Sequence, residues 1–88
     1  MTEDFEIAFE TFVAKREALN DQLLVSRQTV DRLMEERPEP PTIRWLAQIE
    51  VYLKLRRDQL ATLVALDDDF VNLLVKANRG SGASGSIA

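Results

Sequence analysis

The prolines and glycines of this chain lie in only two places. All three prolines fall within residues 37–41, and all three glycines fall at positions 80, 82 and 85. Because proline removes the backbone N–H and pushes the preceding residue out of the helical region, a helix that reaches this cluster ends near Glu36. Pro41 suits the first position of the next helix. We therefore expect two uninterrupted helices, at about residues 3–36 and 41–79, joined by a Pro-rich turn at 37–41.

Apolar residues recur at spacings of three and four in both segments, which is the period of an amphipathic helix and not of a strand. Arg16 and Ser26 interrupt the first stripe, and Arg56 and Asp67 interrupt the second. Stripes sustained over about four heptads are typical of a coiled-coil seam. We expect an all-α fold, a long antiparallel helical hairpin whose seam is formed by Phe5, Phe9, Phe12, Leu19, Leu23, Val30 and Leu33 from the first helix, and Leu46, Ile49, Leu53, Leu60, Leu63, Phe70, Leu74 and Ala77 from the second.

Charged residues at the ends of the two segments agree with these boundaries. Acidic residues follow Thr2, a candidate N-cap, and basic residues lie in the last turn before Gly80, as the helix dipole favours. Asp67–Asp69 can alternatively cap a separate final helix, which leaves open a break near Leu66. Residues 80–88, rich in Gly and Ser, have the composition of a flexible tail that cannot fold alone.

The second segment carries more apolar residues than one seam can cover. A chain of 88 residues hides only about 60–65% of the surface that it exposes when unfolded, so its core is thin. We expect the remaining apolar surface to be covered by other copies of the chain, by other proteins of a larger assembly, or by both. The predicted interface residues are Trp45, Tyr52, Leu55, Val64, Leu66, Val71 and Leu73.

The polar members of the stripes have two interpretations each. If paired residues have numbers that add up to about 79, Arg16 lies about one turn from the level of Asp67, and an ion pair between them would fix the register of the hairpin. Alternatively, Arg16 lays its stem over the seam and keeps its charge in water. Arg56 either reaches a partner chain or likewise lays its stem over the seam and keeps its charge in water.

The available residue types exclude much chemistry. With neither His nor Cys, the chain has no disulfide, no imidazole base and no thiolate, which excludes Ser-His and Cys-His nucleophile systems and zinc sites. Asp67–Asp69 point about 100° apart at successive helical positions, so they form no acid/base pair. We predict a protein that is not an enzyme, with no catalytic residue, cofactor or metal.

The location of the protein follows from two further absences. The acidic start of the chain is unlike a secretory signal peptide, and no apolar run approaches the roughly 18 residues of a membrane span. We expect a protein of the cytoplasm, or of a virion or other assembly, that is not secreted by a signal peptide and does not associate with membranes.

Residues 16–33, REALNDQLLVSRQTVDRL, support a different interpretation. They resemble the helix-turn-helix of the Cro and phage-repressor family, in which a short helix ends before a Val-Ser turn and a recognition helix begins at the Ser. The resemblance extends to about residue 63, although Asn20 and Leu24 replace the family's small residue and its turn glycine. The resemblance implies a compact five-helix domain that binds DNA as a regulator. In that alternative the contacts to nucleic acid come from Arg27, Gln28, Thr29 and Arg32.

A net charge of −4 is unfavourable for a protein whose affinity depends on phosphate contacts, so we place the hairpin first. The expected function is that of a structural or assembly protein acting through coiled-coil-like packing, with a phage or other virion as the expected setting. A further alternative comes from the layout of helix, proline turn and helix, which is similar to that of type III secretion needle subunits and their hairpin chaperones.

Overall fold

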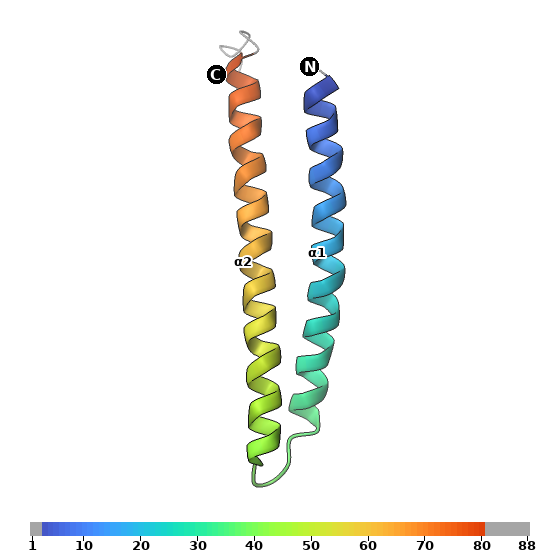
Figure 1. The fold of residues 1–88 in the computed structure, drawn as a ribbon, viewed down its shortest axis with the longest axis vertical. Helices are drawn as coiled ribbons and strands as arrows, with labels where there is room; N and C mark the ends of the chain where they lie inside the picture. The colour runs from blue at the N-terminus through green and yellow to red at the C-terminus, as the bar shows by residue number, and fades with distance from the viewer. Residues whose placement is uncertain (1–2, 81–88) are drawn as a thin grey trace.

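The computed structural model describes residues 3–80, which form two long helices (Figure 1). Helix α1 spans Glu3–Glu35 and helix α2 spans Ile43–Gly80. They run antiparallel, side by side, and the connection between them lies at one end of the rod, so that the two chain ends lie together at the other. The predicted all-α helical hairpin is confirmed. Thr2 and residues 81–88 of the predicted tail lie outside the described residues.

The molecule is a single layer of two helices. Its extents are 63 × 24 × 16 Å, and the shortest is little more than the 10–12 Å diameter of one helix with its side chains. Most domains instead enclose their core between two packed layers. Within residues 3–80, each helix therefore has one neighbour, and no second layer covers the two broad faces of the ribbon.

The start of α2 differs from the prediction. Thr42 is its N-cap, because the Thr42 hydroxyl oxygen accepts a hydrogen bond from the amide of Trp45 (3.1 Å) and the Thr42 carbonyl accepts one from the amide of Leu46 (2.9 Å). Pro41 therefore precedes the cap and does not open the helix. The Glu39–Pro40 peptide bond in the turn is cis.

Both helices are continuous where alternatives had been left open. Asp67–Asp69 lie inside α2, so the helix does not break near Leu66. Residues 16–33, which carry the resemblance to helix-turn-helix domains, lie inside α1 without a turn. The compact five-helix alternative is therefore not the fold of this chain.

The buried core is concentrated at the turn end of the rod. Val30 and Leu33 of α1 pack there against Ile49 of α2, and Trp45 and Tyr52 pack against these three residues. The indole N–H of Trp45 donates a hydrogen bond to the carbonyl oxygen of Leu33 (2.7 Å), which satisfies its polar edge close to the turn.

The open end of the rod is held by aromatic residues. The ring of Phe12 stacks on that of Phe70 with centroids 4.2 Å apart, and the rings of Phe5 and Phe9 lie 6.2 and 5.7 Å from Phe70. Phe70 is buried, whereas Phe9 is about half-exposed. This cluster joins α1 to α2 at the end that no turn connects.

The side of α2 that faces α1 differs from the expected seam. Buried Ile49 and Phe70 and half-buried Leu63 lie on it as expected. Two rows flank these residues, and one of the two packs against α1. That row contains Trp45, Tyr52, Leu66 and Leu73, which were expected to face a partner. The other flanking row stays 38–49% exposed, and it consists of Leu46, Leu53, Leu60 and Leu74.

The physical reason is that both rows fit a spacing of three and four. Each flanks the row of Ile49, Leu63 and Phe70, one turn away on either side, so periodicity alone does not distinguish them. The row that packs inside the hairpin holds Trp45 and Tyr52, which bury the largest side chains at the turn end. It also places Gln59, and not a leucine, opposite Ser26 of α1.

Candidate functional site

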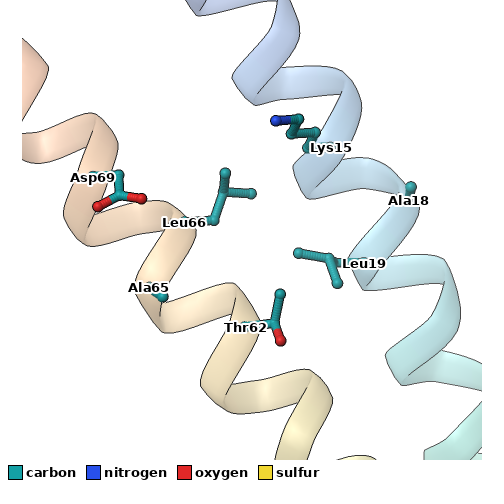
Figure 2. Close-up of a pocket in the computed structure, with 7 residues that line it drawn as sticks. All are labelled: Lys15, Ala18, Leu19, Thr62, Ala65, Leu66 and Asp69. Carbon is teal, nitrogen blue, oxygen red and sulfur yellow. The ribbon is translucent and has the colours of Figure 1, made fainter.

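A hairpin one layer thick has two broad faces, and hollows lie on both of them. One hollow is lined by Asn20, Leu23, Leu24, Arg27, Arg56 and Leu60. The second is lined by Lys15, Ala18, Leu19, Thr62, Ala65, Leu66 and Asp69 (Figure 2). Leu60 and Thr62 are about 200° apart around α2, so the hollows lie on opposite sides of the seam.

We name the first surface the Leu60 face. It continues along both helices through residues three, four or seven positions from those of its hollow, because such residues share a side of a helix. Its apolar members are exposed: Leu24 is 52%, Leu60 43% and Val64 58% accessible. The face consists of Glu10, Val13, Glu17, Asn20, Leu24, Arg27, Asp31 and Met34 on α1, and Leu46, Glu50, Leu53, Arg56, Arg57, Leu60, Val64, Asp67, Val71 and Leu74 on α2.

We name the opposite surface the Ala65 face. Small and polar side chains predominate on it, such as Ala18, Gln22 and Thr62, and its large exposed apolar residues are Val25, Val51 and Leu55. Figure 2 shows Leu19 and Leu66 projecting toward each other between the two helices, so the apolar floor of this hollow belongs to the seam. The Ala65 face carries fewer large exposed apolar side chains than the Leu60 face.

An ion pair across the seam ties the two helices together in their middle third. The Nε of Arg16 donates to Oδ1 of Asp67 (3.0 Å), and Nη2 donates to Oδ2 (3.3 Å), a two-pronged contact. Of the two interpretations of Arg16, the structure shows the ion pair with Asp67. The hydrogen bond to Asp67, together with the charge of its carboxylate, raises the pKa of Arg16. Both side chains stay about 40% exposed, so the pair fixes the alignment more than it adds stability.

A second polar contact across the seam involves Ser26, which is 2% exposed. Its hydroxyl donates to Oε1 of Gln59 (2.8 Å) and also lies 3.1 Å from the carbonyl oxygen of Leu23. Sequence reasoning recognised Ser26 as an interruption of the stripe but missed Gln59, because Gln59 lies on the row that was not assigned to the seam. A buried Ser opposite a Gln at matched seam positions is the signal that identifies the correct row.

The residues expected to contact DNA in the alternative interpretation all lie within α1. Arg27, Gln28 and Arg32 are exposed, and the Thr29 hydroxyl donates to the carbonyl oxygen of Val25 (2.9 Å). Arg27 lines the hollow of the Leu60 face and lies 4.0 Å from the carboxylate of Asp31. The structure does not set these four residues on a separate recognition helix.

Within residues 3–80, no three His, Cys, Asp or Glu side chains gather where a metal ion could bind. Neither α1 nor α2 contains a stretch that is both long and apolar enough to cross a membrane.

Comparison of the chain with protein-family models, with curated proteins and with solved structures finds no match.

Proposed function

We propose that this hairpin is a structural or assembly protein that acts by packing its Leu60 face against another helical surface, in the manner of a coiled coil or four-helix bundle. The observation that carries the proposal is the exposed apolar row of α2, Leu46, Leu53, Leu60 and Leu74, which runs the length of the rod beside the seam. A one-layer ribbon has no element of its own to cover this row.

The energetics favour a partner on this face. Full burial of a Leu or Val side chain contributes about 1.5–3 kcal/mol, and these side chains are roughly half-exposed, so each retains about half of that for docking. Val64 and Val71, one turn from Leu60 and Leu74, widen the row to a stripe that a facing helix can engage by ridges and grooves. The sum of these contributions is a gross value. The net free energy of association is smaller, because holding two molecules together costs entropy.

Charge argues for a protein partner over DNA. The arginines of the Leu60 face share it with acids that include Glu17 and Asp67, and the chain carries a net charge of −4. A phosphate backbone favours unopposed bases. A mixture of apolar rows and both signs of charge is instead typical of helix–helix interfaces.

Site-specific photo-crosslinking in the cells that make this protein tests the proposal. A photoreactive residue in place of Leu53 or Val64 is expected to give protein crosslinks, because both side chains lie on the Leu60 face. The matched controls replace Gln22 and Thr62 on the Ala65 face, where we expect crosslinks at least tenfold weaker. Equal yields from both faces, or crosslinks to nucleic acid alone, would contradict the proposal.

A further inference from the structure

We propose that the partner on the Leu60 face is a second copy of this chain, packed face to face with its turn at the opposite end of the rod. This inference rests on the proposed function and names the partner of the same surface. It is drawn from the order of charged and apolar residues along the face.

Contacts across the seam show which residues of α1 and α2 lie at the same level. The pairs Phe12–Phe70, Arg16–Asp67 and Ser26–Gln59 have numbers that add up to between 82 and 85. By that rule, Glu17 lies level with Asp67. Because Arg27 and Arg57 are each ten residues from these acids, they also lie level with each other, about 15 Å nearer the turn.

The Leu60 face therefore carries two charged bands. Glu17 and Asp67 form the acidic band. Arg27 and Arg57 form the basic band, beside Arg56, which lines the same hollow, and Asp31, which lies 4.0 Å from Arg27. Between the bands lies an uncharged middle formed by Asn20, Leu24, Leu60 and Val64. The side chains of Glu17, Arg27, Arg57 and Asp67 are at least partly open to solvent, from 38% for Asp67 to 69% for Arg57.

An antiparallel second copy matches this pattern. On α2, rotation about a two-fold axis at the level of residue 62 sets Leu60 opposite the partner's Val64, and Arg57 opposite the partner's Asp67. It also sets Leu53 opposite the partner's Val71. A contact of this isologous kind requires the surface to complement itself, as the middle of this face does.

The same axis works for α1. Its face is symmetric about the level of residue 22, where rotation sets Glu17 opposite the partner's Arg27 and Asn20 opposite the partner's Leu24. Levels 22 and 62 coincide by the rule that the seam contacts give. One axis therefore pairs opposite charges on both helices at once, although nothing in the hairpin itself requires their patterns to coincide.

The parallel arrangement, with both turns at the same end, is unfavourable. It lays α1 on the partner's α2 at matching levels, which sets Arg27 against the partner's Arg57 and Glu17 against the partner's Asp67. Like charges that face each other across an interface oppose association.

In the antiparallel arrangement Asp67 faces the partner's Arg57. Asp67 already accepts two hydrogen bonds from Arg16, but its two oxygens have lone pairs left for a second guanidinium.

Distances between spin labels test the orientation. The chain has no Cys, so a single cysteine introduced at Ala61 or Val75, both exposed and away from the seam, takes one label specifically. In the antiparallel dimer the axial separation between like labels is about 3 Å at position 61 and about 39 Å at position 75. Equal distances at the two positions would show the parallel arrangement and overturn the orientation.

A monomer at millimolar concentration, with no distance between molecules at either position, would overturn the second copy as partner. Protein crosslinks from the Leu60 face would in that case still support the proposed function. Failure of the second copy as partner is therefore distinguishable from failure of the proposed function.

A charge exchange on α1 tests the pairing without touching the seam. Glu17→Arg places two bases opposite each other twice per dimer, and we expect the dissociation constant to rise at least tenfold. Adding Arg27→Glu restores opposite charges and is expected to recover most of that loss. Gln22→Arg on the Ala65 face is the matched control and leaves the constant within about twofold. A double variant as weak as the single one would overturn the proposed register.

Discussion

The two faces of this hairpin border the same seam but are built differently. The Leu60 face carries leucines and valines at heptad spacing with charges in bands, and the Ala65 face carries mainly small and polar side chains, with Val25, Val51 and Leu55 exposed among them. The difference arises on α2, which has apolar residues on both sides of its central row. One flanking row, with Trp45 and Tyr52, folds against α1, and the other, with Leu53 and Leu60, stays exposed. A helix with one apolar row too many for its own hairpin has a surface suited to a partner.

The largest expected effect comes from weakening the seam between α1 and α2, because both faces depend on it. Phe70 is buried under three phenylalanines of α1, so Phe70→Ala removes the main contact of the open end. We expect it to lower the free energy of unfolding by about 3–5 kcal/mol, measured by urea titration of the helical circular dichroism. Val75→Ala, at an exposed position, is the control. A loss for Phe70→Ala below about 1 kcal/mol would mean that the aromatic cluster does not hold the open end.

The next effect distinguishes the faces directly. Leu60→Asp places a charge in the middle of the Leu60 face, and Thr62→Asp places the same charge on the Ala65 face. We expect the first to raise the dissociation constant of the assembly at least about 100-fold, or about 2.7 kcal/mol, and the second to change it less than threefold. Sedimentation equilibrium measures both. Equal responses would remove the distinction between the faces.

A smaller effect concerns which of the two flanking rows of α2 packs against α1. Ser26→Ala leaves Oε1 of the part-buried Gln59 without the hydroxyl that donates to it, and we expect a loss of about 1–2 kcal/mol in the free energy of unfolding. Ser26→Ala combined with Gln59→Leu replaces both polar groups by apolar ones and is expected to recover most of that loss. If the double variant is no more stable than the single one, the hydrogen bond is not what Ser26 contributes.

The smallest effect comes from Glu50, which accepts a hydrogen bond from Lys54 (2.7 Å); that hydrogen bond and the lysine charge lower the pKa of Glu50 from its ordinary value. A carboxylate with a lowered folded-state pKa stabilises the fold above its unfolded-state pKa, and that contribution is lost as the pH falls through the folded-state value. Because the pair is exposed, we expect Glu50→Gln to change the melting temperature by less than about 1 °C at pH 7 and not at all near pH 2. A larger change at pH 7 would show that this pair contributes more than an exposed ion pair does.

Much of the fold follows from the sequence, because proline placement and apolar spacing are local signals. They predicted both helices and the turn, and they left the pairing of Arg16 with Asp67 as one of two interpretations. The helix start at Thr42 was missed because Pro41 and Thr42 both suit a helix N-terminus, and only the hydrogen bond to the amide of Trp45 decides between them.

The α2 side of the seam was not predictable from spacing. The two rows that flank Ile49 and Phe70 have the same period, and the row of Leu53 and Leu60 is the more apolar of the two. The choice depends on contacts between distant residues, above all Trp45 with the carbonyl of Leu33 and Gln59 with Ser26. The sequence therefore indicated an excess of apolar surface on α2 but exchanged the inner and outer rows.

The mass of the particle in solution tests the central claim most directly, by light scattering on a size-exclusion peak of the unmodified chain and of Leu60→Asp. Covering of the Leu60 face by a second copy predicts twice the 10.0 kDa of one chain, and return to a single copy in the variant. A single copy for the unmodified chain at millimolar concentration, or a double mass that survives Leu60→Asp, would contradict it.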